Sequence, residues 1–196
     1  MIELTKKEQE TVLLVYKSFT SYYNANSLAK EIGLSQVGTM KLLKKLDRED
    51  ILVSKKIGKS YIYKINIGEE IVRKLIAFIL INESRKYLKW KEEFKSLNKS
   101  GRIILFYGSA SRNYAQARDI DLMVILNKSD VKEVRDKILE IQKMLPKKMH
   151  SIEATKNDLI ENLKNKNKAM IDIIKTAIVL YGYDDYMGVI NGFTNF

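Results

Sequence analysis

Two stretches of sequence, IILFYGS at residues 103–109 and DIDLMVIL at residues 119–126, decide how the second half of this chain is expected to fold. Each contains a run of apolar residues that is typical of a β-strand. Because successive side chains of a strand point to opposite faces, Asp119 and Asp121 share one face. Two carboxylates on one face can hold the Mg²⁺ ions that bridge nucleotide phosphates, since Mg²⁺ prefers hard oxygen ligands. Asp119 and Asp121 are therefore candidate catalytic residues and metal ligands.

The turn after the first strand supplies the second part of this candidate site. Gly108 allows the backbone to approach phosphate oxygens, and Ser109, at the start of a helix, adds a hydroxyl where backbone N–H groups attract anions. A chance Gly-Ser turn upstream of a strand with two surface aspartates would give the same pattern. The two halves together, at this separation, favour a nucleotide-binding site.

The pattern Gly108-Ser109 followed by Asp119-x-Asp121 resembles the signature of the polymerase-beta-type nucleotidyltransferases, especially the small archaeal and bacterial members. The resemblance covers about residues 101–182. It implies an Mg²⁺-dependent transferase in which an acceptor hydroxyl attacks the α-phosphate of an NTP, with ATP as the expected nucleotide. Arg112 falls where the family often carries an arginine, and it would neutralise phosphate charge as a nucleotide-binding residue.

A third carboxylate normally completes the metal site of this family, and Glu153 is the candidate for that catalytic role. It belongs to a predicted strand at residues 149–154, where alternation places it on the face opposite His150. Whether Glu153 faces solvent or metal is left open by the sequence, and so is the activity of the site. His150 is the single histidine, and a lone histidine in a strand is usually a packed or exposed polar residue. The resemblance assigns it no role.

The first third of the chain predicts three helices and a β-hairpin. A capping box at Thr5–Glu8 begins the first helix, a second runs from Asn26 to Gly33, and a third starts at Ser35. Two β-prone runs, 51–53 and 61–65, then flank a Gly58-Lys59 turn. Residues 5–67 resemble the winged helix–turn–helix domain of regulators, which places its second helix in the major groove of DNA and its wing along the backbone.

Basic side chains on the expected DNA-facing side extend this resemblance. Lysines contact phosphates, whereas base edges are usually read by Arg, Asn or Gln, so Gln36 is the one plausible base reader. Asp50 stands where such sequences often carry glycine. The alternative interpretation is a winged helix used for protein docking or dimerisation. The candidate DNA-binding residues are Gln36, Gly38, Lys41, Lys44 and Lys45 on the helix and Lys55, Lys56 and Lys59 on the wing.

The predicted fold class is α+β. We expect a winged helix–turn–helix domain at residues 1–68, a connecting helix at 69–100 and a nucleotidyltransferase-like α/β domain with a mixed sheet at 101–196. The connecting helix carries an apolar stripe of Ile71, Leu75 and Ile79. Because winged helices commonly bind paired half-sites, this stripe is a candidate seam for a homodimer, although it can equally pack within one chain.

Composition excludes several classes of protein. With no cysteine among 196 residues, disulfide frameworks and thiol nucleophiles are excluded, and a single histidine excludes a multi-histidine metal cage. The longest apolar run, residues 75–81, is far shorter than the ~20 residues that span a bilayer. No secretory leader is visible, so we expect a cytoplasmic protein with no membrane partner. The formal net charge of +11 favours a polyanionic partner. A surface rich in lysines that bind no partner would give the same net charge.

Two functions remain open from the sequence. The first is a DNA-binding protein whose second domain binds an NTP and transfers a nucleotidyl group. The second is a transcriptional regulator, or an antitoxin-like protein of a toxin–antitoxin pair, with a catalytically weak nucleotide-sensing domain. The partners expected are double-stranded DNA, an NTP with Mg²⁺ and, for the second function, a helical toxin-like protein.

Overall fold

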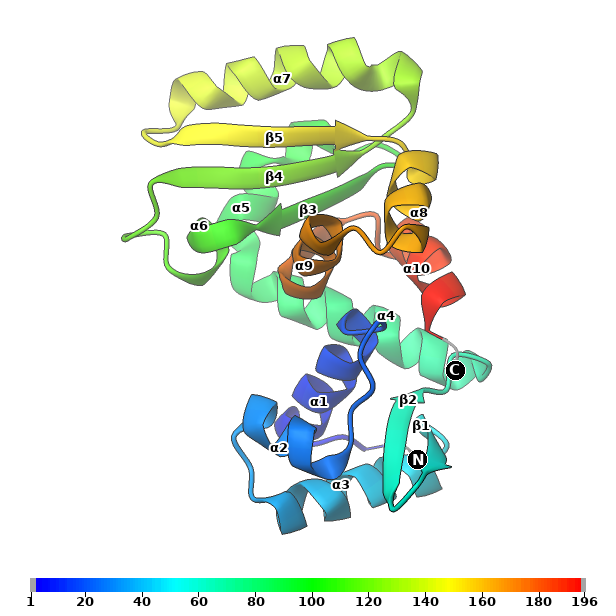
Figure 1. Cartoon of the computed structure of the whole chain (residues 1–196). Helices are drawn as coiled ribbons and strands as arrows, with labels where there is room; N and C mark the ends of the chain where they lie inside the picture. The colour runs from blue at the N-terminus through cyan, green and yellow to red at the C-terminus, as the bar shows by residue number, and fades with distance from the viewer. Residues whose placement is uncertain (1–2, 195–196) are drawn as a thin grey trace. The chain divides into compact units, whose positions relative to one another are not determined.

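The structure, a computed structural model, describes residues 3–194 (Figure 1). The chain divides into two compact units: residues up to 79 together with those from 190 onward form one, and residues 80–189 form the other. The division falls within helix α4 (Glu70–Ser84). The three-part division at residues 68 and 100 stays a prediction.

The first unit has the order of elements predicted from its sequence. A hydrogen-bonded capping box of Thr5 and Glu8 begins α1, Gly33 ends α2 in the left-handed conformation with φ 66°, and the Ser35 side chain caps α3. A two-stranded antiparallel hairpin follows these helices. The elements are α1 (Lys6–Lys17), α2 (Ala25–Ile32), α3 (Gln36–Arg48), β1 (Leu52–Ile57) and β2 (Ser60–Ile65). The assignment of this unit as a winged helix–turn–helix domain stays a prediction.

Apolar side chains from each of these elements form the core of the first unit. Asp50, which stands at the expected glycine position, adopts a left-handed conformation with φ 56° in the turn before β1. The C-terminal segment belongs to the same unit, because the Tyr16 hydroxyl donates to Asn191 and the rings of Phe19 and Phe193 lie 5.9 Å apart. The fully buried residues include Val12, Tyr16, Leu28, Leu43, Leu46 and Ile51.

The second unit is built on a four-stranded mixed sheet with the order β5-β4-β3-β6. Strands β4 and β5 are parallel, whereas β3 is antiparallel to both β4 and β6. The predicted mixed sheet is therefore confirmed. The strands are β3 (Ile103–Tyr107), β4 (Asp119–Ile125), β5 (Lys148–Ala154) and β6 (Ile178–Tyr181).

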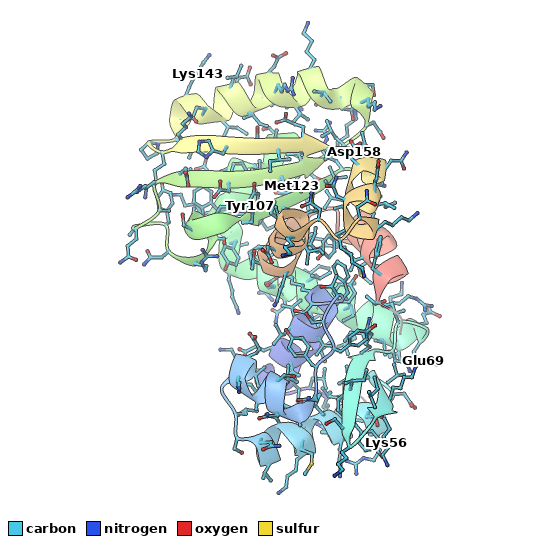
Figure 2. The ribbon with its side chains drawn as sticks, in the orientation of Figure 1. Lys56, Glu69, Tyr107, Met123, Lys143 and Asp158 are labelled. Carbon is cyan, nitrogen blue, oxygen red and sulfur yellow. The ribbon has the colours of Figure 1, made fainter. Side chains whose placement is uncertain are left out.

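Helices surround this sheet. Those of the second unit are α5 (Leu88–Glu93), α6 (Gly108–Arg112), α7 (Val131–Met144), α8 (Lys156–Lys164), α9 (Lys168–Thr176) and α10 (Tyr183–Ile190). Short 3₁₀ turns of this unit lie at Arg85–Tyr87, Lys95–Leu97 and Lys128–Asp130, and a further one at Asn191–Phe193 belongs to the first unit. Helix α7 ends just before Pro146, as its sequence predicts, and Lys143 lies on its outer side (Figure 2).

The main core of the second unit lies on one face of the sheet. Ile120, Leu122 and Val124 of β4 are buried there together with side chains of α5 and α7. Since side chains alternate along a strand, Asp119 and Asp121 are left on the opposite face. Burial of Ile120, Leu122 and Val124 in this core thus orients both carboxylates.

The predicted connecting helix is not continuous. Helix α4 ends at Ser84, a 3₁₀ turn follows, and α5 begins at Leu88. The apolar pattern of this segment is interrupted at Asn82, which indicates a break there, and α4 ends close to that position. The Ser84 hydroxyl donates to the carbonyl of Ile81 and shares a hydrogen bond with the Tyr183 hydroxyl, so its hydrogen bonds join the end of α4 to the start of α10.

The predicted dimer seam is not a uniform exposed stripe. Ile71 is 57% exposed, but Ile79 is buried and Leu75 is half-buried. Phe78, which the sequence analysis did not single out, is 55% exposed. An apolar surface of α4 would therefore include Ile71 and Phe78 rather than Ile79, and the homodimer stays a prediction.

Candidate active site

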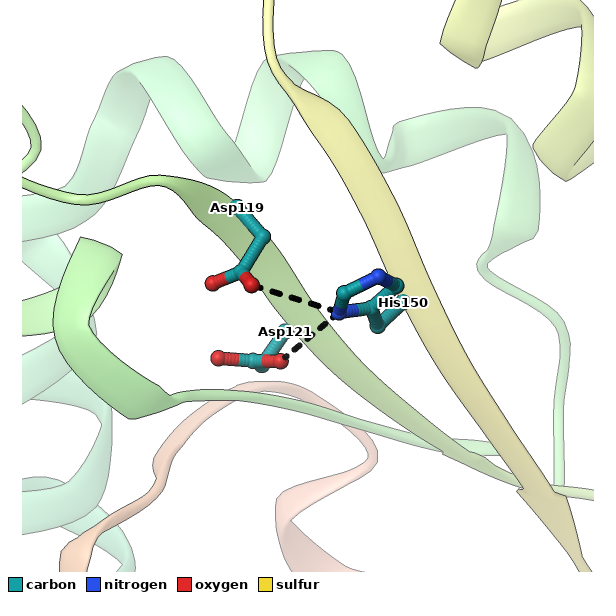
Figure 3. Close-up of side chains that lie close together, drawn as sticks. All are labelled: Asp119, Asp121 and His150. Carbon is teal, nitrogen blue, oxygen red and sulfur yellow. Dashed lines mark ion pairs between the residues drawn. The ribbon is translucent and has the colours of Figure 1, made fainter.

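Three side chains from two adjacent strands lie close together on one face of the sheet (Figure 3). Asp119 and Asp121 open β4, and His150 lies beside Asp121 in the parallel register of β5. The Nδ1 atom of His150 lies 3.4 Å from Oδ2 of Asp119 and 3.8 Å from Oδ1 of Asp121. One ligand atom from each residue lies within 4.8 Å of the others, so the three can share a metal ion.

The two carboxylates repel each other. Burial raises the pKa of Asp121, the negative charge of Asp119 raises it further, and His150 acts in the opposite direction. Burial and the charge of Asp121 also raise the pKa of the Tyr107 hydroxyl to about 12, so this hydroxyl keeps its proton at neutral pH. A cation held between the carboxylates would relieve the repulsion.

Gly108 lies directly against the carboxylate of Asp121. Its φ of 75° belongs to the left-handed region, and a Cβ at this position would overlap the Asp121 side chain. The sequence analysis predicted a glycine that permits close approach of phosphate. The structure adds that glycine is needed for the close approach of Asp121.

Replacing Gly108 by alanine should damage both stability and the site. The left-handed conformation costs an alanine about 1–2 kcal/mol, and the new methyl group must displace Asp121. We expect urea denaturation to show a loss of at least this size, together with weaker binding of metal and nucleotide in calorimetry.

Gly188 provides the matched control, because it lies in α10 and nothing lies within 4 Å of its added Cβ. Gly188→Ala should leave stability unchanged or raise it by up to about 1 kcal/mol. Equal effects of the two substitutions would contradict a special role for Gly108.

The other predicted phosphate-binding residues lie on α6. Ser109 and Arg112 are both exposed, and α6 follows directly after β3 and lies against β4. Both residues therefore lie in the short helix that begins at Gly108, and a ligand can reach both side chains from solvent.

Glu153 lies away from the aspartates. Its carboxylate accepts hydrogen bonds from Ser151 Oγ at 2.6 Å and from Arg135 Nε at 3.1 Å, and it pairs in register with Val124 on the core side of β4. The structure therefore does not bring Glu153 to Asp119 and Asp121. The physical reason is the alternation of β5, which puts His150 on the aspartate side and Glu153 on the side of α7.

Sequence reasoning missed His150 as a member of the site. The alternation of side chains along this strand already placed His150 and Glu153 on opposite faces, and that pattern could have indicated His150. Parallel pairing of this strand with β4, at the register that sets His150 beside Asp121, was the missing information. That register comes from the tertiary fold.

The predicted DNA-binding residues occupy different environments. Gln36, Lys41 and Lys44 are exposed on α3, and Lys55, Lys56 and Lys59 are exposed on the hairpin, where Figure 2 labels Lys56. Gly38 is half-buried, and its backbone N–H donates to the capping Ser35 side chain. The Lys45 ammonium donates to Glu8 Oε1 at 2.8 Å.

Lys45 and Glu8 form an ion pair within the first unit. Burial favours a higher pKa for Glu8, but hydrogen bonds from Lys45 and Thr5 and the charge of Lys45 outweigh it and lower the pKa below its ordinary value of 4.5. A carboxylate with a lowered folded-state pKa stabilises the fold above pH ~4.5, and this contribution is lost as the pH falls through the lowered pKa.

Lys45→Met should therefore reduce stability at neutral pH, because it leaves the mostly buried Glu8 without its cation. The difference from the wild type should shrink as the pH falls below 4.5 and Glu8 becomes protonated. Urea denaturation at a series of pH values measures this. Lys44→Met, at the exposed neighbouring residue, is the control, and a difference that stays constant with pH would refute the ion pair as the cause.

Comparison with known protein families gives a match within the second unit. Residues 88–181 match the family model of the nucleotidyltransferase domain. The matched segment contains Gly108, Asp119, Asp121 and His150. No curated protein and no solved structure matches the chain. Within residues 3–194, no helix is long and apolar enough to cross a bilayer.

Proposed function

We propose that the second unit binds a nucleoside triphosphate with a divalent metal ion and transfers its nucleotidyl group to an acceptor hydroxyl. The observation that carries this proposal is the pair of carboxylates on β4, set beside the Gly108 turn inside the segment that matches the family. Their donor atoms fit a hard divalent cation, and a cation would stabilise the ionised form of Asp121, whose pKa is raised by burial and by the charge of Asp119.

In the proposed reaction, the acceptor hydroxyl loses its proton to water as its oxygen forms a bond to the α-phosphorus, and the bond from that phosphorus to the leaving pyrophosphate breaks. Bound metal would supply charge neutralisation at the phosphates. The chain supplies the rest: Gly108 leaves room at the turn, Arg112 offers an exposed guanidinium to phosphate oxygens, and the protonated Tyr107 hydroxyl can donate a hydrogen bond.

Calorimetry with Mg-ATP, followed by transfer assays with α-labelled NTPs, tests this function. Wild-type protein should bind the nucleotide, and the double substitution Asp119→Ala with Asp121→Ala should lose binding. Transfer of label to an acceptor would identify an enzyme. Binding without transfer would favour the nucleotide-sensing alternative, and unchanged affinity in the double variant would reject the site.

A second proposed function is DNA binding by the first unit. The observation that favours it is the exposure of Lys41 and Lys44 on α3 and of three further lysines on the hairpin. Val37 and Met40 are also exposed on α3, at 60% and 41%, which suits either contact with thymine methyl groups or the protein-docking alternative. Regulation of an operator, an antitoxin-like role and a helical toxin-like partner stay predictions.

A further inference from the structure

We infer that Nδ1 of His150 is a metal ligand and that this nitrogen makes the site select a divalent first-row transition-metal ion over Mg²⁺. This inference rests on the proposed metal–nucleotide function and specifies which class of ion that function uses. The resemblance to the nucleotidyltransferases, by contrast, implies Mg²⁺ and a site made of oxygen donors alone.

The geometry supplies the first reason. Two donor atoms that share an ion at about 2.0–2.2 Å lie roughly 3–4 Å from each other. The Nδ1 atom of His150 lies 3.4 Å from one oxygen of Asp119 and 3.8 Å from one oxygen of Asp121. Figure 3 shows that Nδ1 points towards both carboxylates and that Nε2 points away. The nitrogen therefore already stands at ligand distance from both oxygens.

The position of Glu153 supplies the second reason. Glu153 is held by Arg135 and Ser151 on the other side of β5, so it does not reach the aspartates. Among residues 3–194, the group that brings three metal-binding side chains together here is Asp119, Asp121 and His150. The third donor of this group is thus an imidazole nitrogen rather than a carboxylate oxygen.

The chemistry of the donors sets the preference. Mg²⁺ favours oxygen ligands and gives up its water reluctantly, whereas imidazole suits first-row transition ions, whose affinities exceed that of Mg²⁺ at nitrogen-containing sites. A site of two carboxylates and one imidazole should therefore bind Mn²⁺ more tightly than Mg²⁺. His150 should account for a large part of that difference.

Electron spin-echo spectroscopy of Mn²⁺ added to the tag-free, nucleotide-free full chain tests the ligand directly. Because His150 is the single histidine of the chain, a ¹⁴N coupling of imidazole type can come from this residue alone. We expect that coupling in the wild type and its loss in His150→Ala. Because the spectrum of the wild type alone identifies the ligand, the test stays valid even if His150→Ala folds poorly.

Titration of the same proteins with Mn²⁺ and with Mg²⁺ tests the selectivity. His150→Ala should weaken Mn²⁺ binding by at least about tenfold, the lower range seen when even an outer partner of a metal ligand is removed. Mg²⁺ binding should change much less. His150→Asp makes all three donors carboxylates. This variant should therefore show a smaller ratio of Mn²⁺ affinity to Mg²⁺ affinity than the wild type. Ser151→Ala, the neighbouring position on the opposite face of β5, is the matched control and should leave both affinities unchanged.

The outcomes separate this inference from the proposed function. Mn²⁺ binding without a ¹⁴N coupling, with equal losses for both ions in His150→Ala, would overturn the inference and leave the proposed function standing. Failure of the wild type to bind either ion, with or without nucleotide, would overturn both.

Discussion

Asp121→Asn is expected to abolish nucleotidyl transfer and, at the same time, to stabilise the metal-free protein. The substitution keeps the shape of the side chain and removes the negative charge that would hold the metal and its nucleotide. Loss of one electrostatic group aimed at the reacting phosphate costs about 100–1000-fold in rate, so transfer should fall by at least 100-fold. Stability should rise because burial and Asp119 both disfavour the ionised form of Asp121.

Transfer of an α-labelled nucleotide and thermal melting of metal-free protein measure the two effects. Each kcal/mol of repulsion relieved should raise Tm by about 2–4 °C in a chain of this size. Asp136→Asn on α7 is the matched control, since Asp136 is exposed on a helix that packs on the opposite face of the sheet. Asp136→Asn should change neither property. Retained transfer in Asp121→Asn would remove this residue from the mechanism.

Reversing the charge of Lys41 and Lys44 is expected to produce the second large effect, a loss of binding to duplex DNA. Both lysines are exposed on α3, whereas Lys45 is paired with Glu8 and is left unchanged. Each phosphate contact contributes about −0.9 to the slope of log affinity against log salt, so two contacts contribute about 2 × −0.9 = −1.8. The double variant Lys41→Glu with Lys44→Glu should bind more weakly and with a correspondingly shallower slope.

Fluorescence anisotropy with labelled DNA over a range of salt concentrations measures both quantities. Lys132→Glu with Lys143→Glu is the matched control, because these exposed lysines lie on α7 of the other unit and their reversal changes the net charge equally. Equal weakening by the two double variants would indicate a general charge effect. A binding signal insensitive to salt would reject the electrostatic account. Binding of Mg-ATP should stay intact in both variants.

Features that depend on neighbours along the chain could be predicted from the sequence. The capping box at Thr5 and Glu8, the left-handed end of α2 at Gly33 and the helix that stops before Pro146 all follow from local backbone chemistry. The shared face of Asp119 and Asp121 follows from strand alternation in the same way. These features required no knowledge of distant parts of the chain.

Features that depend on pairing between distant segments could not be predicted. The ion pair between Lys45 and Glu8 joins residues that lie 37 positions apart, and the local sequence does not single out that partner. The hydrogen bond between the hydroxyls of Ser84 and Tyr183 joins residues that lie 99 positions apart. In each case the local sequence allows several partners, and the tertiary structure selects one.

The candidate site likewise has one part that follows from the sequence alone and another part that depends on the tertiary structure. By itself, the sequence determined that two carboxylates open β4 on one face and that a Gly-Ser turn lies upstream of them. The tertiary structure decided that β5 lies parallel to β4 with His150 beside Asp121, while Glu153 faces α7. The physical reason is that alternation along one strand is local, whereas the register between two strands is set by the burial of both strands against a common core.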